Sequence, residues 1–457
     1  MSNLTATMSI ATGAIAVEQG ALTETANNVA NVNTPGYSRK QAQFSENPPV
    51  VLGQLTFGTG VSLGKVTSVR DPILQQQIQQ QSGQESELDA LVTGMKQVQA
   101  QFSSQGSDIG TQLSALFASL SQLSTDPANL ALRQGVLTAA GNLASTFNNT
   151  ANNLGAQRSN LDLNVSQAVA QVNTLTHEIA KVNAQITELQ NLHEDASSFI
   201  DQRDVLINQL SGLIDVSQIQ SDTGITLTTS NGTALVSGSQ AFALSTQMDA
   251  SGVQHIFSNG KDITSEINAG QLGGLLDVRD EKIPALLTSL DTLAAGIVNA
   301  FNHANSLGLD LNGNAGGNLF TPPPASGQGA AAVIAVAITD PALLAASSDG
   351  SVASNGNLAN FSAIHDSGLI NGETPSAYYS NIVFGVGNDV ANGTAELQSS
   401  QLVLQQLQDQ RGSLSGVSLD EEAANMVQYQ RAYDAAAQLV TVINQMLQTL
   451  INMGTGA

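Results

Sequence analysis

The sequence of 457 residues contains no cysteine and no tryptophan. Without cysteine, the chain can form neither disulfides nor thiolate metal sites, and it has no cysteine nucleophile. Aromatic residues make up only 4% of the chain, although hydrophobic residues make up 41%. Its cores must therefore consist mainly of Leu, Ile, Val and Ala. Leu, Ala and the abundant Gln favour helices, so we expect a largely helical protein with roughly two to four domains.

Basic residues are also scarce, since 14 Lys and Arg face 37 Asp and Glu, for a net charge of -23. Nucleic acids and anionic membranes bind proteins through Lys and Arg, so neither is an expected partner. An acidic surface repels other copies of the chain, so self-assembly has to use apolar contacts. The N-terminus lacks the pattern of a cleavable signal peptide, and no uninterrupted apolar run appears long enough to span a bilayer. Taken alone, these absences indicate a cytosolic protein.

Near the start, four apolar residues recur at steps of seven: Met8, Ile15, Leu22 and Val29. Glu18 and Thr25 interrupt the positions between them, so the stripe is imperfect. Pro35-Gly36 suits the central positions of a type II turn. The pattern predicts a helix that ends near Asn31, followed by a turn and by extended segments up to residue 69.

The longest apolar stripe runs from Phe147 to Leu189 in steps of three and four, and it predicts one long helix in a bundle. Another helix is expected after Asp71-Pro72. From residue 216 the period changes to alternation, and the turn signals Asn231-Gly232 and Asn259-Gly260 predict a small β-rich domain. Further along, a strand is expected over residues 333–338, and a helical pattern resumes near residue 397.

The final segment carries the most regular stripe of the chain: Met426, Tyr429, Tyr433, Ala436, Val440, Ile443, Leu447 and Leu450. Ser418 and Glu421 form a capping-box pattern before it. An unpaired amphipathic helix would expose its stripe to water. The two terminal stripes can therefore pack on each other, on neighbouring copies, or on the body of the same chain. Periodicity alone favours none of these.

The patterns together predict a mainly α protein with β-rich inserts, of the α+β class, with long helices and small β domains. Six segments are expected: residues 1–70, an N-terminal helix and extended segment; 71–215, a helical bundle domain; 216–275, a β-rich domain; 276–310, a helix returning to the bundle; 311–395, an outer insert; and 396–457, C-terminal helices that include a helix over 418–453.

The sequence contains no convincing catalytic or metal-binding motif. The five histidines lie far apart, and none has the spacing of a helical zinc site. Residues 60–64 match the nucleophile-elbow pattern, but strand-like residues follow where that motif needs a helix. Asp310 begins a calcium-loop pattern that fails, because Ala315 and Thr321 replace the required Gly and Glu. No catalytic, cofactor or metal residue is predicted, and the chain is not expected to be an enzyme.

One long motif closely resembles the N-terminal signature of bacterial flagellar rod, hook and hook-associated proteins. Its members in this chain include Asn27, Asn28, Asn31, Asn33, Thr34, Pro35, Gly36 and Tyr37. Residues 415–426 and 429–433 are similar to the C-terminal signature of the hook-associated branch, and residues 273–280 resemble an internal stretch of it. Ser38-Arg39 after the first motif also favours this branch over the hook protein.

The resemblance implies a structural protein of the flagellum that forms the junction between hook and filament and is required for filament assembly. It implies export to the cell exterior without a cleaved signal peptide. The implied partners are copies of the chain in a ring, the hook protein, a second hook-associated junction protein, and a cytosolic export chaperone on the C-terminal helix. It also implies terminal helices that pair as a coiled coil.

The surface expected to carry this assembly comprises Met8, Ile15, Leu22, Val29, Met426, Tyr429, Tyr433, Val440, Ile443, Leu447 and Leu450. An alternative identity is another axial protein, such as a hook or distal rod protein. A second alternative is a secreted helical adhesin or effector.

Overall fold

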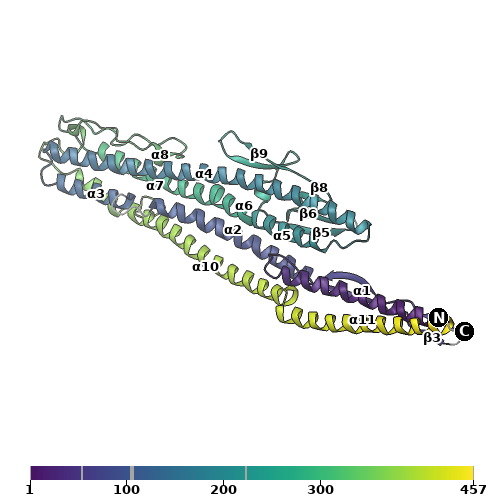
Figure 1. The fold of residues 1–457 in the computed structure, drawn as a ribbon. Coiled ribbons are helices and arrows are strands. Elements are labelled where there is room, and N and C mark those ends of the chain that lie inside the picture. Colours follow the sequence, from purple (N-terminus) through teal and green to yellow (C-terminus); the bar gives the residue numbers. More distant parts are fainter. Residues whose placement is uncertain (1, 53–54, 103–107, 222–223, 456–457) are drawn as a thin grey trace. The chain divides into compact units, whose positions relative to one another are not determined.

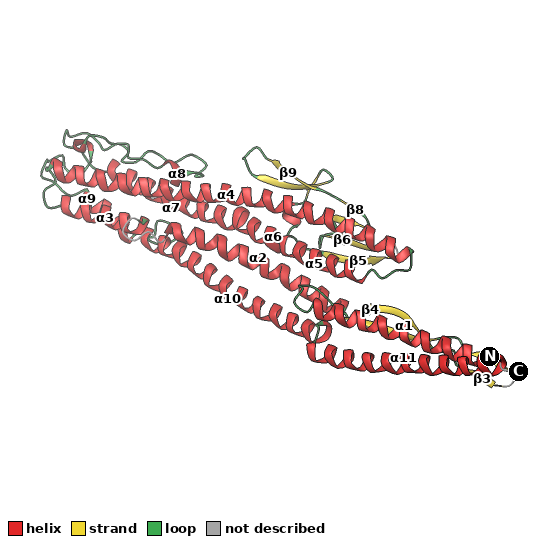
Figure 2. Ribbon diagram, in the orientation of Figure 1, coloured by secondary structure: helices red, strands yellow, loops and turns green. Residues whose placement is uncertain are grey.

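The computed structural model describes residues 2–52, 55–102, 108–221 and 224–455, most of which are helical (Figure 2). Small antiparallel sheets are inserted among the helices, which confirms the expected fold class. The chain divides into two compact units. The first contains Met1–Gly83, Gln171–Ala243 and Gln401–Ala457, and the second contains Gln84–Ala170 and Leu244–Ser400.

The helices include one of 62 residues, α4, as the long stripe predicted. Their bounds are α1 (Ser2–Ala30), α2 (Pro72–Phe102), α3 (Ile109–Leu123), α4 (Leu130–Asn191), α5 (Ser197–Leu213), α6 (Gly270–Asp277), a π-helical turn (Val278–Lys282), α7 (Ile283–Ser306), α8 (Ala330–Val333), α9 (Leu358–Asp366), α10 (Pro375–Ser415) and α11 (Leu419–Thr455).

The strands form two hairpin-like pairs and two larger sheets, all antiparallel. β1 (Lys40–Glu46) pairs with β4 (Val61–Ser68), and β2 (Val50–Leu52) pairs with β3 (Leu55–Phe57). A four-stranded sheet consists of β5 (Ser217–Ser221), β6 (Gly224–Thr228), β7 (Ala234–Ser237) and β8 (Gln240–Ala241). A three-stranded sheet consists of β9 (Leu244–Met248), β10 (Gln254–Ser258) and β11 (Lys261–Asp262).

In the first unit, α1 and α11 lie side by side, and the two ends of the chain meet at one end of this pair (Figure 1). The two helices are therefore antiparallel. The β1–β4 pair packs along α1. Within one chain, the terminal helices therefore pack on each other, which is one of the alternatives that periodicity left open.

In the second unit, three phenylalanines surround Phe301 of α7. Its ring centroid lies 5.8 Å from that of Phe117, 5.9 Å from that of Phe320 and 5.9 Å from that of Phe361. Rings at such distances contribute attraction beyond the burial of their area. A chain without tryptophan thus builds one aromatic core from four phenylalanines.

The second unit also buries an arginine completely. Arg279 donates to Asp162 over 2.7 Å and to the Gln254 carbonyl over 2.8 Å, and its other nitrogens bind Asp280. Its exposed fraction is 0%. The ion pair and the carbonyl together satisfy a charge that burial would otherwise make costly.

Three expectations about the second half of the chain need correction. The strand expected over residues 333–338 is wrong, because α8 ends at Val333 and Val336 forms only an isolated bridge with Phe320. The helix expected near residue 397 begins at Pro375, where the Thr374 hydroxyl accepts from the Ala377 amide over 3.2 Å. The strands of the single β-rich domain expected over residues 216–275 form two sheets, one in each unit.

One helical stretch of the described chain, Gly270–Ser306, is apolar and long enough to cross a bilayer by composition and length. Charged residues, among them Arg279 and Asp291, interrupt this stretch, so it is not the uninterrupted apolar run that the sequence analysis found to be missing. Within it, Leu290, Ile297 and Phe301 are fully buried in the second unit. Core packing therefore accounts for its apolar composition.

Replacing Arg279 with Met should lower the free energy of unfolding by about 3–5 kcal/mol, because it leaves the Asp162 carboxylate buried without its counter-charge. Urea denaturation measures this loss. Lys261→Met is the matched control, since Lys261 is exposed and pairs with Glu266 at the surface. Its expected cost is below about 1 kcal/mol. Equal losses in the two variants would contradict the role assigned to Arg279.

Candidate functional site: the terminal helix pair

The helix α1 packs against α11 and against the β1–β4 pair. Its buried residues are small or polar: Ala11, Val17, Ala21, Thr25 and Asn28. Small side chains let two helices approach closely, and they leave little apolar surface to cover a partner. On α11 the most deeply buried apolar residue is Ile443, which is 2% exposed.

The residues predicted to form the assembly surface lie at different depths in this pair. Met8, Ile15, Leu22 and Val29 are half-buried, and they flank the buried face of α1 instead of forming its centre. On α11, Tyr429, Tyr433, Val440 and Leu447 are half-buried, whereas Met426 and Leu450 are exposed. The role of these residues in assembly stays a prediction.

A second apolar stripe on α11, of which the sequence analysis named only Leu450, is exposed. It comprises Leu439, Val442, Met446, Leu450 and Met453, whose exposed fractions lie between 42% and 72%. Their spacing of three and four residues places them on one face of the helix. We call these five residues the outer stripe. These residues recur with helical spacing in the sequence, but their positions alternate with those of the stripe that α1 partly covers.

The end of α1 is tied to the start of α11 by a single buried amide. The Asn28 Oδ1 atom accepts from the Tyr37 hydroxyl and from the Lys40 amide, each over 2.9 Å. Its Nδ2 atom donates to the Lys40 carbonyl over 2.8 Å and to Glu422 over 3.2 Å. An asparagine side chain offers two donors and two acceptor lone pairs, so Asn28 uses its whole capacity.

The turn that follows α1 has the geometry that Pro35-Gly36 predicts. The Tyr37 amide donates to the Thr34 carbonyl over 3.2 Å, and Gly36 has a φ of +82°. A type II turn requires a positive φ at this position, which favours glycine. A Cβ at Gly36 would also lie only 2.2 Å from Cγ2 of Val205 on α5. Arg411 of α10 donates to the Gly36 carbonyl over 2.8 Å.

The other residues of the N-terminal signature lie outside the hydrogen-bond network of Asn28. Asn27, Asn33, Thr34 and Pro35 are exposed. Asn31 is half-buried, and its side chain donates to the Asn27 carbonyl over 2.9 Å. Burial, reinforced by nearby carboxylates, raises the pKa of Tyr37 to about 12, so its hydroxyl stays a neutral donor to Asn28.

Two aspartates of α5 interact with the segment after the turn and with Arg70. The Ser38 amide donates to Asp201 over 3.3 Å, and Arg70 binds Asp201 over 2.6 Å and Asp204 over 3.5 Å. Burial raises the pKa of both aspartates above its ordinary value, although Arg70 opposes this effect. The ion pairs offset part of the cost of burying these carboxylates.

Contacts to α11 and to α5 complete this region. Arg39 forms an ion pair with Glu421, and its amide donates to the Ser415 carbonyl over 2.9 Å. Lys40 donates to the Ser198 hydroxyl over 2.7 Å. We call the region the clasp and define it by Asn28, residues 36–40, Arg70, Asp201, Asp204, Arg411, Glu421 and Glu422.

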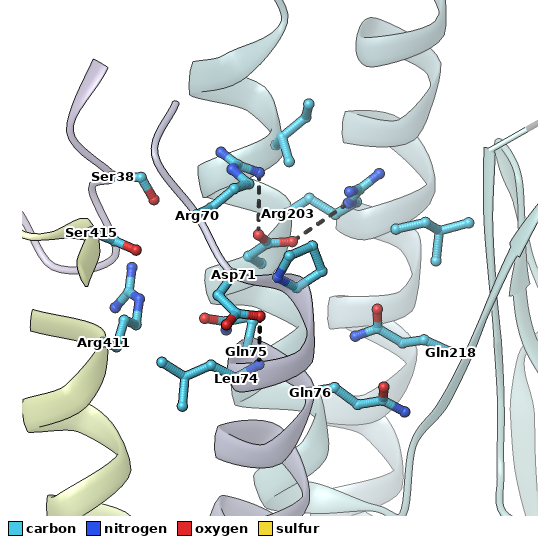
Figure 3. Close-up of a pocket in the computed structure, with 14 residues that line it drawn as sticks. Ser38, Arg70, Asp71, Leu74, Gln75, Gln76, Arg203, Gln218, Arg411 and Ser415 are labelled. Carbon is cyan, nitrogen blue, oxygen red and sulfur yellow. Dashed lines mark hydrogen bonds and ion pairs between the residues drawn. The ribbon is translucent and has the colours of Figure 1, made fainter. Parts of the chain in front are cut away.

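The clasp lies beside a cavity of about 240 Å³. Figure 3 shows Arg70, Arg203 and Arg411 around it, contributed by the segment before α2, by α5 and by α10. Sequence reasoning found the first signature and the start of α11. It missed Arg70, Asp201 and Asp204, because nothing in the local pattern around them indicates what they face.

The described residues contain no cluster of three or more His, Cys, Asp or Glu side chains that could hold a metal ion. Residues 61–64 of the apparent nucleophile elbow belong to strand β4. The Asp310 carboxylate accepts from the amides of Asn312 over 2.8 Å and of Asn314 over 2.9 Å, so it shapes a turn. The geometry of the clasp suits holding segments together.

Comparisons with known proteins all concern the flagellum. A family model for the flagellar hook-associated protein FlgK helical domain matches residues 95–320. A model for the flagellar basal body rod FlgEFG protein C-terminal region matches residues 410–453. Flagellar hook-associated protein 1 of Bacillus subtilis (strain 168) is 28% identical over 97% of this chain and 97% of its own. The protein of that name from Escherichia coli (strain K12) is 26% identical over 95% of this chain and 97% of its own.

A solved structure of the flagellar hook junction protein FlgK from Burkholderia pseudomallei superposes with a TM-score of 0.67. It covers 74% of this chain and 100% of the solved chain, at 17% sequence identity. The two chains therefore share a fold.

Replacing Asn28 with Ala should open the clasp, because it leaves the buried Glu422 carboxylate and the Lys40 backbone without their partner. Each buried group left unsatisfied costs about 1–3 kcal/mol. Hydrogen exchange should become faster in residues 31–40 and at the start of α11, with the second unit unchanged. Asn27→Ala, at an exposed position of the same motif, should leave exchange as in the wild type. Faster exchange in both variants, or in neither, would refute this role.

Replacing Gly36 with Ala should destabilise the first unit by two separable effects. The left-handed φ costs about 1–2 kcal/mol, and the clash with Val205 adds about 1–3 kcal/mol. Gly232→Ala isolates the first effect, since Gly232 has a φ of +86° and open space around its Cβ position. The double variant Gly36→Ala/Val205→Ala should recover most of the second effect in urea denaturation. No recovery would show that Val205 does not constrain the turn.

Proposed function

The chain belongs to the family of flagellar hook-associated protein 1, and we propose that it is a structural component of the bacterial flagellum at the junction between hook and filament. The observation that carries the proposal is the antiparallel α1–α11 pair with an exposed apolar stripe beside its seam. Family membership places the chain in the flagellum, among proteins that associate with other flagellar components. The family is structural, in keeping with a chain that is not expected to be an enzyme.

The outer stripe supplies the surface for assembly in this proposal. It is a contiguous row of exposed apolar side chains, and such patches mark interaction sites on soluble proteins. Burying one Leu, Val or Met side chain fully contributes about 1.5–3 kcal/mol. Because the chain carries a net charge of -23, copies that approach each other need such an apolar contact to offset charge repulsion.

The family resemblance suggests the partners that would use this surface. Copies of the chain would form a ring through their terminal helix pairs, between the hook protein and a second hook-associated junction protein. Before assembly, the exposed stripe on α11 is an aggregation hazard, so a cytosolic export chaperone would cover it. The chain would leave the cell without a cleaved signal peptide and act outside it.

The proposal includes a coupling between assembly and folding. Helices such as α1 and α11 gain most of their stability from packing. Most apolar residues of the pair are only half-buried within one chain, so further apolar surface remains to be covered by neighbouring copies. The pair can then open for export and close when neighbouring copies cover the outer stripe.

The match of residues 410–453 to the C-terminal model of rod proteins favours one alternative, another axial protein such as a hook or distal rod component. That match covers only the end of the chain. The hook-associated relatives align over 95% or more of it, which favours the junction.

The test is complementation of a deletion strain that lacks this protein. Without complementation, the strain should make hooks without filaments and release flagellin into the medium. The variant Leu439→Ser/Val442→Ser/Met446→Ser should fold like the wild type in circular dichroism and urea denaturation, since these side chains are exposed. It should nevertheless leave the cells without filaments, because the apolar contact between copies is lost.

Two further variants make the comparison sharp. Gln438→Ser/Gln445→Ser changes exposed polar positions of the same helix and should restore filaments. Ile443→Ser/Leu447→Ser acts on the side that faces α1, so it should loosen the pair and also block assembly while the body of the protein stays folded. Normal filaments with the outer-stripe variant would overturn the proposed surface, and normal filaments in the deletion strain would overturn the function.

A further inference from the structure

The cavity beside the clasp contains a buried arginine that the assembly proposal does not use. Arg203 of α5 is 9% exposed and lines this cavity of about 240 Å³. Its closest charged neighbour is Asp204, whose Oδ1 atom lies 3.8 Å from the Arg203 Nε atom. Among the described residues, no acceptor forms a hydrogen bond with the buried Nε–H of Arg203.

This situation is costly for a guanidinium. The group carries five N–H donors, and each buried donor without an acceptor costs about 1–3 kcal/mol. Arg279 in the second unit shows how the same chain satisfies a buried arginine, with two carboxylates and a carbonyl. Arg203 lacks such a set, so its donors are available to a group that enters the cavity.

The charges around the cavity favour an anion as that group. Arg70 and Arg411 line it together with Arg203, and Figure 3 shows all three approaching it from different segments. Arg70 already binds Asp201 and Asp204, so these two carboxylates are not free counter-charges. Burial raises the pKa of both aspartates, which weakens their repulsion of a further anion.

The remaining acid of the lining is also occupied. The Asp71 carboxylate accepts from the amides of Ile73 over 2.9 Å and of Leu74 over 3.2 Å, where it caps α2. Three guanidinium groups thus face carboxylates that all have partners already. In a chain with only 14 basic residues and a net charge of -23, this concentration of positive charge is exceptional.

We propose that this cavity binds a small oxyanion, held by the Arg203 guanidinium with Arg411 and Arg70 beside it. The planar guanidinium matches carboxylate, phosphate and sulfate oxygens through paired N–H donors. A cavity of about 240 Å³ is several times the roughly 30 Å³ that one water occupies, so it accommodates a group of this size. The oxyanion is either a free ion or a carboxylate side chain of a second copy of the chain. The cavity would bind it whether or not the chain stands at the hook–filament junction.

The test uses the purified full chain and inorganic phosphate at constant ionic strength, followed by calorimetric titration and thermal unfolding. Phosphate should bind at one site per chain and raise the unfolding midpoint in a saturable way, relative to chloride. Arg203→Gln should weaken binding at least tenfold and abolish the shift. Arg431→Gln, which changes the net charge equally at an exposed position of α11, should bind like the wild type.

Arg203→Lys keeps the charge without the planar fork, so it should bind more weakly than the wild type but more tightly than Arg203→Gln. This variant keeps the test informative if Arg203→Gln does not fold. Sedimentation velocity then distinguishes the sources. If a carboxylate of a second copy is the occupant, phosphate should reduce self-association of the chain, whereas a free ion should leave self-association unchanged or increase it. No saturable binding, or equal binding to the wild type and to Arg203→Gln, would overturn the proposal.

Discussion

The buried amide of Asn28 forms hydrogen bonds that connect three segments of the first unit. It binds both backbone groups of Lys40, where the chain enters β1, and it reaches Glu422 in the first turn of α11. Because all four of its hydrogen-bonding positions are used, any shift of one segment leaves a polar group unsatisfied in the interior. Asn28 therefore constrains the relative placement of α1, the turn and the start of α11 more tightly than the surrounding ion pairs do alone.

The second constraint is the imbalance between the two terminal helices. The buried face of α1 includes two alanines, a threonine and an asparagine, whereas α11 carries two adjacent apolar stripes. Within one chain, α1 partly covers one stripe of α11 and leaves the outer stripe exposed. The clasp holds the pair by polar contacts where apolar area is limited. In the proposed assembly, one face of α11 packs within the chain and another contacts neighbouring chains.

Two of the buried arginines, Arg279 and Arg203, show how the same group can serve different purposes. Arg279 has carboxylate and carbonyl partners, so it acts as a structural centre of the second unit. Arg203 has an incomplete set of partners and lines a cavity, so its unsatisfied donors are a reason to expect a ligand. Burial alone does not distinguish these roles. The number of hydrogen-bond acceptors near each guanidinium does.

The sequence by itself determined the features that depend on near neighbours. The three-four spacing of apolar residues predicted α4 and α11, and Pro35-Gly36 and Asn259-Gly260 predicted turns that have the required positive φ at Gly36, Asn259 and Gly260. Only the tertiary structure decided which apolar stripe of α11 is covered and which polar residues meet. Asn28 and Glu422 are 394 positions apart, and no local pattern encodes their contact. Periodicity records that a face is apolar, whereas packing geometry and hydrogen-bond capacity decide what lies against it.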